Sequence, residues 1–230
     1  MTRIVPVILL AAGLAAPAFA QTAPAPADAP VSAEAAAAAP AADAAAGQAG
    51  ATIDPSAPAG EYMFDQEHSA VAFTYDHNGM STSPGLIRGV SGSVTLDPAN
   101  PENSRVEAMF PLSRIQTVSA MLDEHLGGED FFAGAAPATA VTFTSTSVEQ
   151  TGPDTARVTG DLLLNDVTAP VTLDVTLRFL GPNPMTQQPA VGFDATGTLL
   201  RSDFNLGAFA PAVSDEVTFN IAVEAARPAS

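Results

Sequence analysis

Alternation between apolar and polar residues constrains the fold of this chain more than any other feature. In the segment 62–79, every second residue from position 71 onward is apolar, and a histidine then continues the same parity. Side chains of a strand alternate between its two faces, so one face carries Val71, Phe73, Tyr75 and His77. The segment therefore predicts a strand with an apolar face that ends in a titratable group.

The same alternation recurs along the chain and predicts an all-β domain of eight strands. The segments that carry it are 62–77, 86–96, 105–112, 141–143, 158–164, 171–179, 191–195 and 217–223. Turn-forming pairs such as Asn78-Gly79 and Gly181-Pro182 separate them. Residues 118–128 have helical spacing instead, with Ser119 as N-cap and Gly127-Gly128 as a stop. We therefore expect a short helical insertion between strands three and four.

Eight antiparallel strands with apolar inner faces can close into an up-and-down barrel, whose lumen is either filled with side chains or holds one small ligand. A two-sheet sandwich is the competing arrangement, but closure removes the two exposed edges of an open sheet. Small residues on the expected inner face leave room inside the barrel: Gly92, Ala108, Gly160, Ala195 and Gly197.

The first sixty residues differ in character from the rest of the chain. Residues 1–20 combine Arg3, an apolar run and the cleavage motif Ala18-Phe19-Ala20, which predicts a secretory signal peptide. Residues 21–59 contain 19 alanines and 6 prolines, which predicts a disordered Ala/Pro-rich linker. The barrel domain is then residues 60–226. We expect a secreted, periplasmic protein without a stable membrane anchor, because the apolar run is shorter than the roughly 20 residues of a spanning helix.

Composition argues against some classes of partner. The formal net charge is −17, and all 8 basic residues are arginines. Such a surface repels nucleic-acid phosphates and anionic lipid headgroups, so we expect no nucleic-acid partner. Cysteine is absent, and a domain of this size needs no disulfide. We also expect no cofactor.

Signatures of catalysis and of metal binding are missing from the sequence. The chain has no Cys nucleophile, no G-x-S-x-G elbow, no G-x-G-x-x-G phosphate loop and no H-E-x-x-H element. His68 and Ser69 point to opposite faces of a strand and form no dyad, and we expect His68 to be a structural capping residue. His68, His77 and His125 lack the close spacing of paired zinc ligands. We expect no enzyme and no metal site, and a metal-dependent enzyme is the third alternative.

Several motifs give the chain a resemblance to a known family. In order along the chain, they are Tyr62, Asp65, His68-Ser69, Phe73 and His77, the pair His125-Leu126, the loop Asp130-Phe131-Phe132, the hairpin 160–175, Arg201-Ser202-Asp203-Phe204 and Ser214-Asp215-Glu216-Val217. In these motifs, which span most of the domain, the chain resembles the YceI-like family. The resemblance implies a secreted lipocalin-like barrel with a helical insertion, which holds a polyisoprenoid or fatty amphiphile in an elongated apolar cavity.

The chain departs from the family pattern in two places. Asn205 stands where members usually carry Gly, and Asn also adopts a positive φ, so the turn can survive. Asp123 and Glu124 stand where relatives often carry basic residues, which weakens the expectation of an anionic headgroup. An anionic group would require a guanidinium near the cavity mouth, for which the candidates are Arg88, Arg114 and Arg201.

The expected ligand-binding residues lie on the inner faces of the strands and in the loop after the helix. They are Val71, Phe73, Tyr75, His77, Phe110, Phe131, Phe132, Phe143, Val175, Phe193, Arg201 and Phe219. His77 is either a contact for the polar head of a ligand or a histidine bonded to a loop carbonyl. Phe131 and Phe132 either pack in the core or close a cavity mouth. Arg201 and Asp203 share one face if they lie in a strand, where they would form an ion pair that closes a barrel end.

The sequence therefore predicts a binding protein that carries or sequesters an isoprenoid or fatty amphiphile in its barrel. The alternative is a non-catalytic structural or envelope-stress interaction protein with a filled barrel, which would have no continuous apolar tunnel. A homodimer is compatible with the sequence, which leaves the oligomeric state open.

Overall fold

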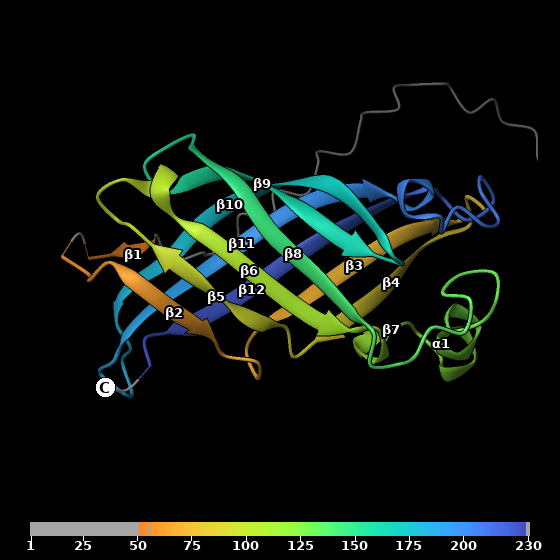
Figure 1. Ribbon diagram of the computed structural model, residues 1–230, viewed down its shortest axis with the longest axis horizontal. Helices are drawn as coiled ribbons and strands as arrows, with labels where there is room; N and C mark the ends of the chain where they lie inside the picture. The colour runs from red at the N-terminus through yellow and green to blue at the C-terminus, as the bar shows by residue number, and fades with distance from the viewer. Residues whose placement is uncertain (1–50, 55, 229–230) are drawn as a thin grey trace, which may run out of the picture. The chain divides into compact units, whose positions relative to one another are not determined.

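The computed structural model describes residues 51–54 and 56–228, so the expected signal peptide and residues 21–50 of the expected linker lie outside it. A single sheet closes on itself in this part of the chain (Figure 1). Its strands are β1 (Thr52–Ile53), β2 (Gly60–Phe64), β3 (Ala70–His77), β4 (Ser81–Arg88), β5 (Ser91–Leu96), β6 (Arg105–Pro111), β7 (Ile115–Gln116), β8 (Ala140–Gln150), β9 (Thr155–Leu164), β10 (Val167–Pro182), β11 (Pro189–Leu200) and β12 (Glu216–Ala226).

The wall of the barrel has eight positions, which we call staves. Three of these staves are each made of two successive strands: β2 with β3, β4 with β5, and β6 with β7. β2 and β3 both pair antiparallel with β12, and β5 and β4 pair with them in turn. β6 and β7 then pair with β5 and β4, and β8, β9, β10, β11 and β12 complete the circuit. The predicted eight-stranded antiparallel barrel is confirmed.

A tight turn interrupts the first stave between β2 and β3. The Asp65 carboxylate accepts a hydrogen bond from the backbone N–H of Glu67 at 2.9 Å, and it contacts His68 Nδ1 at 2.8 Å. This bond raises the pKa of His68 and contributes to a lowered pKa of Asp65. His68 therefore has the structural capping role that its parity predicts.

The helical insertion is α1 (Ala120–Leu126), which lies between β7 and β8 as predicted. The Ser119 hydroxyl accepts a hydrogen bond from the backbone N–H of Leu122 at 3.3 Å, which satisfies one of the free donors of the first turn.

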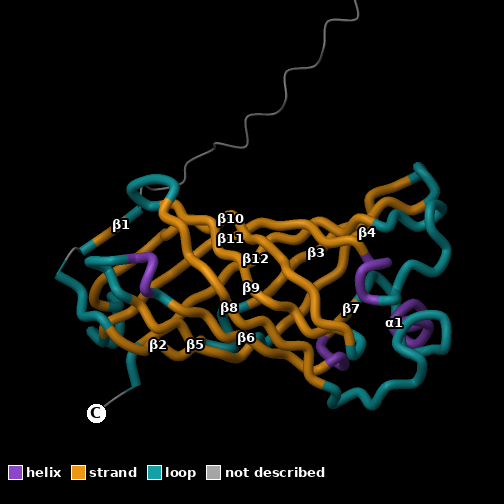
Figure 2. The backbone as a smooth tube through the Cα atoms, turned by 45° about the horizontal axis from the view of Figure 1, so that its top comes forward, coloured by secondary structure: helices purple, strands orange, loops and turns teal. Residues whose placement is uncertain are grey.

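The other helical segments are short 3-10 turns, η1 (Pro101–Asn103), η2 (Leu112–Arg114) and η3 (Arg201–Phe204). Figure 2 shows these helical segments at the ends of the barrel and not along its wall. No helix in the described chain has the length and apolar character required to cross a membrane.

β1 extends the packed structure to residues before the predicted domain start at position 60. Thr52 and Ile53 pair in parallel with Phe179 and Leu180 of β10. β10 has this edge free because its pairing with β9 ends at Thr176. The segment also packs against the interior, since the Tyr62 hydroxyl donates a hydrogen bond to the Pro58 carbonyl at 2.6 Å.

Two apolar clusters occupy the barrel. One contains the buried residues Tyr62, Val94, Leu180, Val191 and Ala225, and it lies at the end that carries β1, which we call the β1 end. The other contains Phe132, Val171, Phe204, Leu206 and Phe219 and lies toward the opposite end, which we call the α1 end. The two ends are visible on opposite sides of Figure 1.

Candidate ligand-binding cavity

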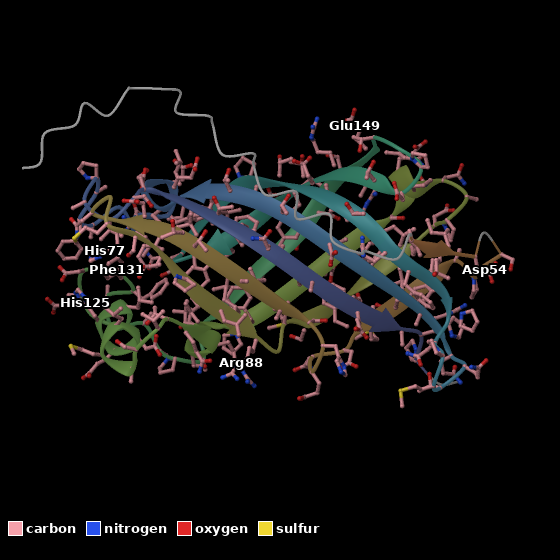
Figure 3. All side chains as sticks on the ribbon, turned by 180° about the vertical axis from the view of Figure 1, so that it is seen from behind. Asp54, His77, Arg88, His125, Phe131 and Glu149 are labelled. Atoms are coloured by element: carbon pink, nitrogen blue, oxygen red, sulfur yellow. The ribbon has the colours of Figure 1, made fainter. Side chains whose placement is uncertain are left out.

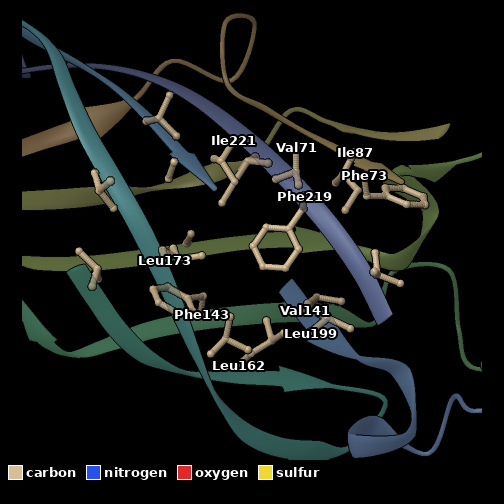
Figure 4. Close-up of a pocket in the computed structure, with 18 of the residues that line it drawn as sticks. Val71, Phe73, Ile87, Val141, Phe143, Leu162, Leu173, Leu199, Phe219 and Ile221 are labelled. Carbon is tan, nitrogen blue, oxygen red and sulfur yellow. The ribbon is translucent and has the colours of Figure 1, made fainter. Parts of the chain in front are cut away.

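A cavity of about 880 Å³ runs through the barrel and is lined by residues from all eight staves. Most of its lining is aliphatic or aromatic, and Figure 4 shows Phe219, Ile221, Leu173, Phe143 and Leu199 projecting into the space. Ligand sites of small molecules range from roughly 300 to 1,000 Å³, so this cavity is near the upper limit.

The barrel is not filled by its own side chains. Inward residues of central strands, such as Val71, Phe73 and Leu173, are only partly buried although they point away from the outer surface. Their remaining exposure is toward the cavity itself. A continuous apolar cavity contradicts the filled-barrel form of the alternative hypothesis.

Three phenylalanine rings lie against glycines of the barrel wall. A Cβ atom added to the glycine would lie 2.0 Å from the ring in the pair Phe73 and Gly85, 2.4 Å in the pair Phe143 and Gly160, and 2.7 Å in the pair Phe219 and Gly197. Gly160 and Gly197 thus leave room on the inner face, as expected, and a phenylalanine ring takes the space directly beside each of them. The rings occupy space at the wall that a side chain would otherwise fill.

All twelve residues predicted to bind a ligand line this cavity. Val71, Phe73 and Tyr75 project from β3 on one face, as their parity requires. Phe131 and Phe132 belong to the loop after α1, where the core-packing alternative holds for Phe132 and closure of a cavity mouth by Phe131 stays a prediction. Phe132 is 9% exposed and packs in the cluster near the α1 end, whereas Phe131 is partly exposed at the edge of the cavity. Their contacts with a ligand remain predictions.

His77 ends β3 at the rim of the cavity and is exposed. Its Nε2 lies 3.2 Å from the side-chain nitrogen of Asn78, and its backbone forms an isolated bridge with Val213. The imidazole thus lies next to a side-chain amide, and among the described residues no loop carbonyl is within hydrogen-bond distance of its ring.

Arg201 is 9% exposed, and its guanidinium binds the backbone of a single loop. Nε donates to the Ser214 carbonyl at 2.9 Å, and Nη2 donates to the Val213 carbonyl at 2.8 Å. Nη1 donates to the Leu206 carbonyl at 2.5 Å and to the Ala208 carbonyl at 3.1 Å. Burial lowers the pKa of Arg201, and the nearby Asp215 opposes this effect.

The predicted ion pair between Arg201 and Asp203 is wrong. Both residues belong to the 3-10 turn η3, so the parity of a strand does not apply to them. The carboxylate near this turn is that of Asp215, which accepts hydrogen bonds from the backbone N–H and the hydroxyl of Ser202 at 2.8 and 2.6 Å. These bonds contribute to a lowered pKa of Asp215.

The three arginines considered for an anionic headgroup do not form such a site. Arg88 is exposed and donates to the Gln116 side chain at 2.5 Å, while Arg114 is exposed and lies near Gly89. Neither lines the cavity. Arg201 does line it, but four of its five N–H donors are used by loop carbonyls.

Uncharged polar groups are available in the cavity instead. Tyr75 and Ser83 are direct partners in the register of β3 and β4, and both line the cavity. Neither hydroxyl has a hydrogen-bond partner among the residues that the structure describes.

No group of three or more His, Cys, Asp or Glu side chains suited to a metal occurs in the described part of the chain.

Comparison with known proteins agrees with this geometry. The model of the YceI-like domain matches residues 62–225. The chain belongs to the YceI-like family. The protein YceI of Escherichia coli is 38% identical to it over 171 residues, which cover 74% of this chain and 88% of that protein.

Solved structures of other proteins share the fold. BcnA of Burkholderia cenocepacia has a TM-score of 0.61 at 23% identity, and the match covers 70% of this chain and 98% of BcnA. A domain of Saccharophagus degradans described as polyisoprenoid binding and as implicated in plant cell wall breakdown has a TM-score of 0.54 at 14% identity. That match covers 73% of this chain and 98% of the domain.

The structure adds cavity residues that the sequence did not identify. Phe209 and Leu206 come from the loop between β11 and β12, and Ile53 comes from β1. A signal for the first two was present, because the segment from Leu206 to Val213 is strongly apolar in an acidic chain. No signal marked Ile53, since a strand of two residues shows no alternation.

Proposed function

We propose that this member of the YceI-like family is a binding protein that holds a polyisoprenoid or another long-chain amphiphile and carries or sequesters it in the periplasm. The apolar cavity of about 880 Å³ is the observation that carries the proposal. Burial of each methylene group contributes about 0.8 kcal/mol, so a long chain binds tightly without specific polar contacts.

Two further observations support the class of ligand. The structural neighbour from Saccharophagus degradans is described as a polyisoprenoid binding domain. The free hydroxyls in the cavity and the occupied donors of Arg201 favour a head that is uncharged over a phosphate or a carboxylate. The periplasmic location rests on the predicted signal peptide.

Extraction of the purified protein tests the proposal. Organic solvent followed by mass spectrometry should release a long-chain amphiphile, and the delipidated protein should bind Nile red, an uncharged apolar fluorophore. Ala108→Phe fills the cavity and should reduce both the amount of amphiphile released and the binding of Nile red. Ala222→Phe, on the exposed face of β12, should reduce neither quantity. Empty protein in repeated preparations, together with no Nile red binding, would contradict the proposal.

A further inference from the structure

Three aromatic rings from two segments of the chain meet at the α1 end of the cavity. The ring of His125 on α1 lies 5.4 Å from that of Phe131 and 5.8 Å from that of Phe209, measured between centroids. Phe131 and Phe209 are also 5.8 Å apart. All three residues line the cavity, and His125 and Phe209 are also exposed to solvent, so the rings lie where the cavity meets the outside. Figure 3 shows His125 and Phe131 at the end opposite Asp54.

Phe209 belongs to a loop that is firmly attached to the barrel. This pinned loop, residues 205–215, receives the four hydrogen bonds of Arg201. Its backbone is also bonded to the end of β3, where the N–H of Asn78 donates to the Ala212 carbonyl at 2.6 Å and the N–H of Ser214 donates to the Asp76 carbonyl at 2.9 Å.

His125 and Phe131 belong to a segment that is attached more weakly. This helix flap, residues 117–136, bonds mainly to itself, as in the 3.1 Å bond from the Phe132 N–H to the Leu126 carbonyl. None of the seven residues of α1 is buried. Within the flap, Phe132 and Leu126 pack against the cluster near the α1 end.

The seam between the flap and the pinned loop has no hydrogen bond in the described part of the chain. His125 approaches Asp130 at 3.3 Å, but both residues are in the flap. Two of the three ring contacts, those of Phe209 with His125 and with Phe131, therefore join the two sides, and separating them leaves no backbone group unsatisfied.

The β1 end is closed more tightly. Tyr62 is completely buried there, and Leu180, Val191 and Ala225 are at most 3% exposed. Opening that end would require breaking this cluster or the backbone pairing of the barrel staves. Parting the flap from the pinned loop at the α1 end breaks ring contacts and the apolar packing of Phe132 and Leu126, but no backbone hydrogen bond between the two described segments.

We propose that the seam between the helix flap and the pinned loop is the portal of the cavity, and that His125, Phe131 and Phe209 form its gate. The flap swings away from the pinned loop to admit the amphiphile and closes over it when the rings meet again. This inference rests on the proposed function, because the gate controls the rate at which the bound molecule exchanges. In many enzymes, the opening of a comparable lid limits the rate at which a bound product leaves.

A reversible cross-link across the seam tests the gate, and the chain offers a clean background because it has no cysteine. The double variant His125→Cys/Phe209→Cys lacks two rings, so before cross-linking it should take up and release Nile red faster than the unaltered protein in stopped-flow fluorescence. A short bis(methanethiosulfonate) reagent should then slow both steps by about tenfold or more, and reductant should reverse this change.

Two controls make the result specific. The variant Asp174→Cys/Thr196→Cys places a cross-link between paired residues on the outer wall, where it should leave both rates unchanged. Methyl methanethiosulfonate modifies the gate cysteines without joining them and should not slow exchange. Unaltered rates after cross-linking of the seam, in protein that binds Nile red at equilibrium, would overturn the portal alone. Absence of equilibrium binding in the unaltered protein would overturn the proposed function and the portal together.

Discussion

Phe73 on β3 and Gly85 on β4 are direct cross-strand partners, and the phenyl ring lies over the glycine. A Cβ atom at position 85 would be only 2.0 Å from the ring's Cζ. Because the obstructing atom is the far end of a side chain, the ring can move, and the direction open to it is the cavity. The glycine therefore preserves space for a ligand.

Gly85→Ala should drive the Phe73 ring into the cavity. We expect the free energy of unfolding to fall by about 1 to 3 kcal/mol, as for other overpacked sites, and the affinity for Nile red to fall as well. Chemical denaturation and fluorescence titration measure the two effects. Phe73→Leu in the same chain should restore much of the loss, so strictly additive effects of the two substitutions would contradict the contact.

The two faces of β11 should respond in opposite ways to a charge. Leu199 lines the cavity, whereas its neighbour Thr198 is exposed and pairs with Thr218 of β12. Leu199→Asp places a carboxylate in an apolar space and should cost several kcal/mol of stability or abolish Nile red binding. Thr198→Asp should change neither by more than about 0.5 kcal/mol. Equal tolerance at both positions would contradict the assignment of faces.

Arg201→Lys should release the pinned loop although it keeps the positive charge. One ammonium group cannot replace a guanidinium that reaches four carbonyls, and charged hydrogen bonds contribute roughly 1.5 to 3 kcal/mol each. We expect a loss of about 2 to 3 kcal/mol in the free energy of unfolding. Amide hydrogen exchange should increase for residues 205–215. A selective loss of ligand affinity with unchanged loop protection would show that Arg201 acts on the ligand instead.

His68 should titrate above the ordinary histidine value of 6.5, because the Asp65 carboxylate accepts its hydrogen bond. The pair stabilises the fold below the unfolded pKa of His68, and this contribution is lost as the pH rises through the higher folded value. Asp65, whose pKa is lowered, loses its contribution as the pH falls through that lower value.

Proton NMR of the three imidazoles measures this titration. The His68 midpoint should fall toward 6.5 in Asp65→Asn and stay raised in Asp166→Asn, a change at an exposed carboxyl in a different turn. If the His68 midpoint is the same in Asp65→Asn as in the unaltered protein, the Asp65 carboxylate is not the cause of the raised pKa of His68.

The barrel was predictable from the sequence because most inward residues of its strands are apolar. Val71 and Phe73 mark a lumen face by parity alone, and Ser119 marks the helix start by its side chain. The positive φ expected of Asn205 is confirmed at 58°, because a short polar side chain tolerates that region. These features depend on residues close in sequence.

Features that depend on distant backbone were not predictable. The partners of Arg201 are carbonyl groups, which every residue has, so no sequence pattern marks them. The 3-10 turn at Arg201–Phe204 also removed the strand parity on which the pairing with Asp203 depended. β1 pairs with an edge of β10 that is free only because β9 is shorter.

β1 and the end of β12 lie at the same end of the barrel, since Thr52 pairs with Phe179 and the Arg227 N–H donates to the Pro189 carbonyl at the nearby β10–β11 turn. Figure 1 places α1 on the other side. An affinity tag or a surface linkage at residue 51 or 228 would therefore orient the immobilised barrel with its aromatic gate facing the solution. In that orientation, a sensor chip would measure uptake without blocking it.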